Sequence, residues 1–299
     1  TVSAVRDTDE STLSSMLLAR IGRMQTWGTG TMEVKSGYGL NTETELRMLR
    51  AVHAAAQQAD AQITGTFLGA HAIDPKQPDF IDLIIEETLP TVAEEFPGIT
   101  CDAYLEHGAW SCDDTRRLFE SAKELNCPIR LHADQFNSLG GVPLAIEFGA
   151  RSVDHLEAIS EEDIKSLAQS DTIGVLLPAS GFHLDGRYAP GRALIDAGAA
   201  IALATNYNPG SAPTPSMPMA IALATRCCGL SPAEAITAAT WNAAVVLGLQ
   251  EDVGSLEVGK RGDVQVLDER DPRAIAWEIG GMPPPIILLG GQPVQFLAE

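Results

Sequence analysis

The chain contains 299 residues, and 40 Asp and Glu against 20 Lys and Arg give it a formal net charge of −20. This acidity argues against a nucleic-acid-binding surface, because such a surface needs a basic footprint. Hydrophobic residues make up 45% of the chain, as in ordinary globular enzymes. The length fits one large domain, alone or with a small one.

Five cysteines occur without a Cys-x-x-Cys spacing. A disulfide framework is therefore not expected, and the composition favours a reducing, cytoplasmic setting. No apolar run is long enough to span a bilayer, so we expect no membrane partner.

Short β-type runs alternate with helical patterns over most of the chain. A helix is predicted first at 9–27. Strands are then predicted at 31–35, 62–68, 100–105, 129–131, 152–153, 172–177 and 200–204. Helices are predicted between and after them at 43–58, 80–95, 113–125, 141–148, 161–169, 191–197, 217–227 and 232–247.

Seven strand–helix units favour an α/β fold of the (β/α)8 type with one strand absent. A doubly wound sheet is the alternative, although five or six units would be more usual for it. After Gly254 the alternation of strands and helices stops. Short strands are predicted there at 263–267, 285–289 and 294–296, separated by turns rich in Gly and Pro. We therefore expect a barrel over residues 1–250 and part of a small β domain over 251–299.

Polar residues stand where the predicted strands end, which is where such barrels carry their chemistry. They are Tyr38, His71, Glu106, His107, His132, Gln135, His155, Asn206 and Asn208. A single histidine of this kind is more often a hydrogen-bonded structural residue than a ligand. Several at equivalent points of successive units indicate a shared polar site, because barrel closure would aim them at one mouth. Imidazoles on separate strands can meet a metal ion, but spacing alone does not identify it.

Other catalytic signatures are missing. The sequence has no Gly-x-Ser-x-Gly elbow, no Gly-x-x-x-x-Gly-Lys-Ser/Thr loop and no Gly-x-Gly-x-x-Gly turn. A serine hydrolase, a P-loop enzyme and a dinucleotide-binding enzyme are therefore unsupported.

In order along the chain, several stretches resemble the imidazolonepropionase family of the amidohydrolase superfamily. They are EVKSGYGL, TFLGAHA, RLHADQ, SVDHLE, GVLLPAS and ALATNYNPGSAPTPSMPM. TAATWNAAVVLGL resembles a segment shared more widely in the superfamily. GSLEVGKRGDVQVLD looks like the return to the small composite β domain that many amidohydrolases carry. The resemblance implies an amidohydrolase barrel that lacks its first strand.

The resemblance also implies roles for individual residues. His132 matches the metal-ligand histidine of the fifth strand, and Asn206 stands where the family has a metal-binding aspartate on the eighth. His155 matches a histidine near the reacting centre. Residues matching substrate-binding positions are Tyr38, His71, Gln135, Asn208, Gly210 and Ser211. Without the family, Gly210 and Ser211 would equally fit an ordinary turn with a helix N-cap.

The implied reaction is metal-dependent hydrolysis of the cyclic amide C–N bond of 4-imidazolone-5-propanoate to N-formimino-L-glutamate, in histidine degradation. One divalent ion, Zn or Fe, would acidify bound water and polarise the carbonyl. His71 or His155 could deliver the proton that the departing nitrogen needs. The implied partner is a small-molecule substrate, with a homodimer as the assembly seen in relatives.

Two departures from the family pattern affect this expectation. The family's first strand carries a His-x-His pair, and no such pair occurs in this sequence, as in a fragment of a longer protein. Asn206 replaces an aspartate, and an amide cannot act as a base. Loss of such a base typically costs about 10²–10⁴-fold in rate. Two alternatives stay open, namely another cyclic-amide hydrolase or aminohydrolase of the superfamily and a non-catalytic relative.

Overall fold

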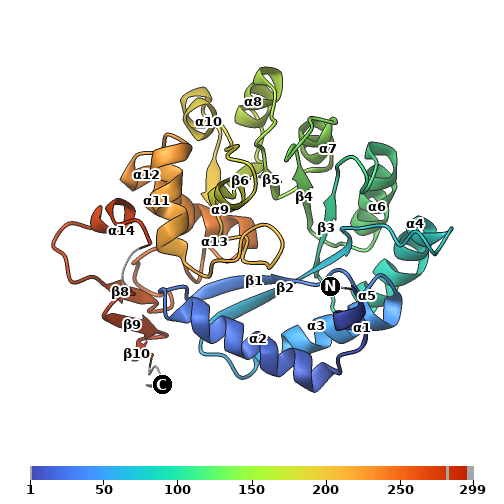
Figure 1. The fold of residues 1–299 in the computed structure, drawn as a ribbon, viewed down its shortest axis with the longest axis horizontal. Coiled ribbons are helices and arrows are strands. Elements are labelled where there is room, and N and C mark those ends of the chain that lie inside the picture. Colours follow the sequence, from blue (N-terminus) through green and yellow to red (C-terminus); the bar gives the residue numbers. More distant parts are fainter. Residues whose placement is uncertain (1, 281–282, 295–299) are drawn as a thin grey trace.

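The centre of the molecule is a sheet of seven parallel strands (Figure 1). The computed structural model describes residues 2–280 and 283–294. The strands are β1 (Thr31–Lys35), β2 (Gln62–Ala70), β3 (Thr100–Tyr104), β4 (Ile129–Ala133), β5 (Ser152–His155), β6 (Ile173–Leu176) and β7 (Ile201–Leu203). They pair in chain order, β1 to β7. A doubly wound sheet would reverse its strand order, so that alternative is excluded.

The sheet curls into a half-barrel whose two edges are β1 and β7 (Figure 1). This confirms the predicted barrel with seven of its strands. Helices surround the strands: α1 (Val2–Arg6), α2 (Glu10–Gln25), α3 (Thr42–Ala56), α4 (Phe80–Leu83), α5 (Leu89–Glu95), α6 (Cys112–Glu124), α7 (Gly141–Phe148), α8 (Glu161–Ala168), α10 (Gly191–Ala197), α11 (Met217–Cys227) and α12 (Pro232–Ala239). The main core lies between strands and helices, where Phe67, Leu131 and Val153 are fully buried.

Local sequence explains where these helices begin and end. Asn41, Ser111 and Ser160 each accept the backbone N–H three residues ahead, which caps α3, α6 and α8. Helix α7 ends at Gly149, whose φ of +64° is a left-handed conformation that glycine adopts without strain.

Several helical segments differ from the sequence prediction, and α1 (Val2–Arg6) and α14 (Ala274–Trp277) were not predicted at all. The helix expected at 80–95 contains a π-helical turn, η1 (Ile84–Thr88), between α4 and α5. The helix expected at 232–247 breaks at Thr240, where φ is −121° and ψ is −87°, and α13 (Trp241–Leu247) follows. Helix α9 (Pro178–His183) was not predicted, because PASGFH is too short to show a helical period.

The inner side of β6 and β7 is apolar. Ile173, Val175 and Ala202 pack there against Val246 of α13, which lies inside the crescent of strands in Figure 1. The buried charged side chains described below come instead from β1, β3, β4 and β5.

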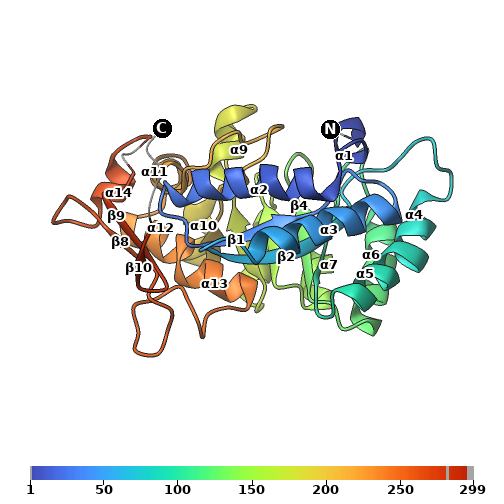
Figure 2. The ribbon, with the colours of Figure 1, turned by 90° about the horizontal axis from the view of Figure 1, so that it is seen from below.

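A second sheet of three antiparallel strands lies at one end of the molecule, next to α14 (Ala274–Trp277) (Figure 2). Its strands are β8 (Val264–Val266), β9 (Ile286–Leu289) and β10 (Gln292–Pro293). Ile287 and Leu289 pack against α2 and β1. The last strand lies before the predicted 294–296, of which 295 and 296 are outside the described residues. The domain boundary at residue 250 stays a prediction.

Among the helices of the described ranges, none combines the length and apolar character needed to cross a membrane.

Candidate functional site

Three of the predicted histidines lie together at the carboxyl ends of the strands. His71 follows β2, His132 lies in β4 and His155 ends β5. The ring centroid of His132 is 6.5 Å from that of His71 and 5.6 Å from that of His155. The ring of His71 lies 4.8 Å from Tyr38 and is stacked 5.2 Å from Tyr104. These distances describe one aromatic and imidazole cluster from the ends of the five neighbouring strands β1 to β5.

The loop that carries Tyr38 is held by a buried glutamate on α3. The carboxylate of Glu45 accepts the backbone N–H groups of Gly37, Gly39 and Leu40. Burial raises the pKa of Glu45 although these hydrogen bonds favour its charged form. A Cβ on Gly39 would lie 2.8 Å from a Glu45 oxygen, so the glycine permits this close approach. The SGYGL motif therefore fixes Tyr38 at the barrel mouth.

Glu106 organises the loop after β4 in the same way. It accepts the backbone N–H groups of His107, Phe136 and Asn137, together with the Asn137 amide. Burial raises the pKa of Glu106, but these hydrogen bonds outweigh it and leave the pKa below its usual value. Glu106 is thus occupied as a loop anchor.

Gln135 and His71 each have a polar group that is left available to a ligand. The Tyr104 hydroxyl donates to Gln135 Oε1 over 2.8 Å, which leaves the Gln135 NH₂ group as a donor. Burial and the neighbouring His132 lower the pKa of His71 to about 4, so its ring is neutral at pH 7. Its Nδ1 is buried and has no hydrogen-bond partner among the described residues. Such an orphaned polar atom suits a site that takes a polar ligand.

Each of the other two imidazoles faces a carboxylate through Nδ1. Asp102 Oδ1 lies 3.1 Å from His132 Nδ1, and Glu157 Oε1 lies 3.3 Å from His155 Nδ1. All four side chains are at most 7% exposed. A carboxylate at Nδ1 holds the proton there and leaves Nε2 as the free lone pair.

The loop after β7 is closed by its own hydrogen bonds. Asn206 donates its amide to Ser180 Oγ over 2.8 Å and to Ser211 Oγ over 3.3 Å. Asn208 Oδ1 accepts the N–H groups of Gly210 and Ser211, both over 2.8 Å, which makes an Asx turn. Ser216, not Ser211, caps helix α11.

Backbone strain gathers at these strand ends. Among the described residues, seven non-glycine residues have positive φ, and six of them lie at strand ends or in the loops that follow: Tyr38, Leu40, Asp134, His155, Leu156 and Asn206. Such conformations cost about 1–3 kcal/mol each and concentrate at functional sites.

A network of charged side chains lies beneath the histidines and was not predicted from the sequence. Its five members are Glu33, Lys35, Asp102, Arg130 and Asp154, from β1, β3, β4 and β5. Burial alone would raise the pKa of Glu33, but Arg130 and Lys35 outweigh it and lower that pKa to about 2. The sequence did contain a signal for this network. In the strands TMEVK, TCDAY and IRLHA, charged residues occupy alternate positions, which point to the same face, although the interior of a barrel is usually apolar.

This network bears on where a metal ion could be held. Asp102, His132 and Asp154 offer ligand atoms within 4.8 Å of one another, so this buried group could hold a metal ion. Both carboxylates are already paired, however, Asp102 with Lys35 at 2.7 Å and Asp154 with Arg130 at 2.7 Å. The free Nε2 of His132 is the better donor. Three carboxylates against two cations leave one net negative charge below it, which favours a cation at that nitrogen.

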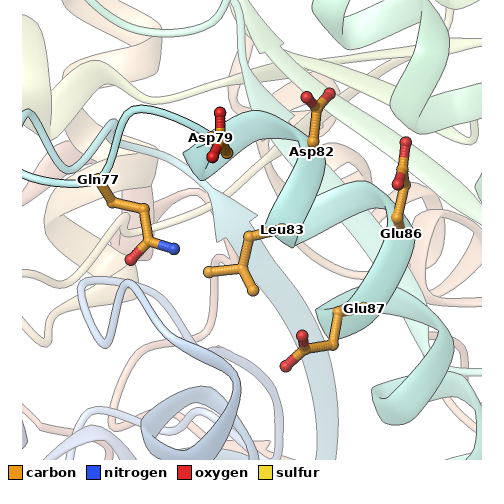
Figure 3. Close-up of a pocket in the computed structure, with 6 residues that line it drawn as sticks. All are labelled: Gln77, Asp79, Asp82, Leu83, Glu86 and Glu87. Carbon is orange, nitrogen blue, oxygen red and sulfur yellow. The ribbon is translucent and has the colours of Figure 1, made fainter.

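A surface hollow over α4 and η1 lies outside this cluster. Its lining is Gln77, Asp79, Asp82, Leu83, Glu86 and Glu87 (Figure 3). Asp82 pairs with Arg117 at 2.7 Å, and Glu87 accepts a hydrogen bond from Thr42. Because none of the strand-end histidines lines it, the hollow belongs to the acidic surface and not to the histidine cluster.

Comparison with known proteins places this arrangement in a family. Residues 3–292 match the amidohydrolase family. The imidazolonepropionase of Herpetosiphon aurantiacus is 43% identical over 99% of this chain and 72% of its own length. The chain belongs to the imidazolonepropionase family. The Rubrobacter xylanophilus imidazolonepropionase is 44% identical, over 94% of this chain and 68% of its own length.

Solved amidohydrolase structures support the fold. E. coli guanine deaminase superposes with a TM-score of 0.77 at 15% identity, covering 98% of this chain and 77% of its own. An adenosine deaminase from Xanthomonas campestris, solved with bound zinc, superposes with a TM-score of 0.70 at 18% identity. It covers 94% of this chain and 69% of its own.

Proposed function

We propose that the strand-end cluster binds 4-imidazolone-5-propanoate and hydrolyses its cyclic amide C–N bond to N-formimino-L-glutamate, a step of histidine degradation. The observation that carries the proposal is that the ring of His132 lies 6.5 Å from that of His71 and 5.6 Å from that of His155, in a chain of the imidazolonepropionase family. The substrate is a flat ring with a carboxylate arm. It suits a site with stacked rings, the fixed Gln135 amide donor and the neutral imidazole of His71.

The residues present fit a divalent metal ion in part. His132 offers a free Nε2 above a net negative charge, and Asn206 Oδ1 accepts no hydrogen bond from the described residues. Zinc or iron at His132, with Asn206 as the further ligand that the family resemblance implies, would supply Lewis acidity and an acidic water. Catalytic zinc sites usually have three protein ligands, so these two residues form only part of a ligand set.

The remaining residues would bind the ring and move protons. Tyr38, His71 and Tyr104 would stack with the imidazolone ring, and the Gln135 NH₂ would donate to its carbonyl oxygen or ring nitrogen. His155, with Glu157 at Nδ1, would first take up at Nε2 the proton released by the attacking water and then give it to the departing nitrogen. The Gly210 and Ser211 amides already bond to Asn208, so Asn208 must turn before that loop can bind a carboxylate.

The proposal is tested by following the loss of 4-imidazolone-5-propanoate with zinc or ferrous iron present. His155→Gln should lower kcat by about 10²–10⁴-fold, the usual cost of losing a general acid. His53→Gln, on the exposed face of α3, is the matched control and should leave turnover unchanged. Equal turnover by both variants would exclude this site, and faster turnover of a purine would indicate an aminohydrolase.

One observation favours a non-catalytic relative as the second candidate. The Asn206 amide is neutral and fixed by Ser180, so it cannot replace an aspartate as a base. Binding of the substrate without turnover, in the presence of metal, would support this candidate. A cytoplasmic location, a homodimer and the choice between zinc and iron also belong to the proposal and rest on the family and the composition.

A further inference from the structure

Asp102, a member of the buried charge network, forms a hydrogen bond with the ring of His132. Its Oδ1 lies 3.1 Å from His132 Nδ1, and its side chain is fully buried. Asp102 is not among the residues for which the family resemblance implies a role. The contact places a carboxylate directly behind the imidazole that faces the barrel mouth.

A second contact prevents Asp102 from turning. Lys35 Nζ donates to its other oxygen, Oδ2, over 2.7 Å. Lys35 also donates to Glu33 over 2.9 Å, and Glu33 pairs with Arg130, so the ammonium is itself held from two sides. The carboxylate is therefore fixed at both oxygens, with one directed to the cation and the other to the ring.

This geometry determines the tautomer of His132. A carboxylate accepts hydrogen bonds and donates none, so Nδ1 of the facing ring must carry the hydrogen. The proton is then absent from Nε2, which becomes a lone pair on the opposite side of the ring. Carboxylates behind metal-ligating histidines have this effect in many metalloproteins, and their loss typically costs 10–100-fold in metal affinity.

We propose that Asp102, locked by Lys35, is a positioning residue that holds His132 in the Nδ1–H tautomer and directs Nε2 to the metal of the proposed hydrolase. The inference rests on the proposed function for the identity of the ligand. The tautomer and the ring orientation can be tested without turnover.

The decisive variant is Asp102→Asn, because Lys35 fixes how the new amide must lie. Lys35 can only donate, so the Asn oxygen stays at Lys35 and the NH₂ group faces His132. The ring must then accept at Nδ1 and carry its hydrogen at Nε2, where it blocks a metal. The variant should therefore invert the tautomer, not merely weaken a contact.

Asp154→Asn is the matched control. It removes one carboxylate from the same network and is similarly buried, but Asp154 bonds to Arg130 and Ser152 and not to His132. Both variants make the same change in charge. Only Asp102→Asn changes the partner of Nδ1.

The test is ¹⁵N NMR of metal-free protein with labelled histidine, which shows which ring nitrogen of His132 bears the hydrogen. We expect Nδ1–H in the native chain and in Asp154→Asn, and Nε2–H in Asp102→Asn. Zinc competition with a chelator should show a loss of about 10–100-fold for Asp102→Asn and a smaller loss for Asp154→Asn. Circular dichroism and urea unfolding establish that each variant is folded.

Nδ1–H in Asp102→Asn, or Nε2–H in the native chain, would overturn the proposal. Equal zinc losses in both variants would reduce Asp102 to one charge among five and would also overturn it. Lack of turnover in the native chain would instead count against the proposed function, because the tautomer is measured without substrate or metal.

Discussion

Arg130 should be among the costliest side chains to remove from the barrel interior. It is 4% exposed, donates to Ser152 Oγ over 2.8 Å and to Asp154 over 2.7 Å, and pairs with Glu33. Arg130→Met would keep most of the volume but leave Asp154 without its cation and Glu33 with Lys35 alone. Breaking a buried pair in this way costs about 3–5 kcal/mol of unfolding free energy. At a slope of about 3 kcal/mol per molar urea, the unfolding midpoint should fall by about 1–2 M.

The matched control is Arg117→Ala. Arg117 pairs with Asp82 at 2.7 Å, but these side chains are 45% and 51% exposed. Exposed pairs of this kind contribute less than about 1 kcal/mol. Equal urea midpoints for the two variants at pH 7 would refute the claim that the inner network is electrostatically coupled.

The effect should also depend on pH in a defined direction. In the native protein the pKa of Glu33 is lowered to about 2, because Arg130 and Lys35 outweigh the effect of burial. Glu33 therefore contributes stability above its unfolded pKa of about 4.3, and this is lost as the pH falls through 2. Without Arg130 the folded pKa of Glu33 rises. The difference in unfolding free energy between native and variant should therefore narrow as the pH falls from 7 to 4, and a constant difference would contradict this account.

Two further predictions concern the loop that carries Tyr38 and the neutral imidazole of His71. Glu45→Gln should lower the free energy of unfolding in urea by about 1–3 kcal/mol, because an NH₂ group would face a backbone N–H. The control is Glu43→Gln on the same helix. The Glu43 side chain is 87% exposed, so this change should leave the free energy of unfolding almost unchanged. An equal cost would contradict the anchoring role of Glu45. His71 has its folded pKa lowered to about 4, so the metal-free protein should lose roughly 3 kcal/mol of stability as the pH falls from about 6.5 to 4. His71→Gln should remove that part of the pH dependence in thermal unfolding, whereas His53→Gln should retain it.

The sequence predicted the barrel well because its signal was local and repeated. The strand at 31–35 and the helices at 141–148, 191–197 and 217–227 coincide with the structure. Helix α9 and the break at Thr240 were missed, since a six-residue helix has no period to detect and the break depends on tertiary packing.

The candidate site could be predicted only as a set of strand ends. His71, His132 and His155 were identified because they follow apolar runs at equivalent places. Their partners were not, since Asp102 lies on a different strand from His132 and only the register of β3 against β4 brings them together. The contact from Asn206 to Ser180 was equally hidden, because Ser180 lies in the unpredicted helix α9.

The most direct test of the central claim compares the native chain with Asn206→Asp for turnover of 4-imidazolone-5-propanoate with metal present. If the histidine cluster is an imidazolonepropionase site that lacks its carboxylate base, Asn206→Asp should raise kcat by about 10²–10⁴-fold. N-formimino-L-glutamate should be the product, identified by mass spectrometry. A native chain that already turns over at the rate of the variant, or a variant that binds metal and substrate but forms no product, would contradict the account.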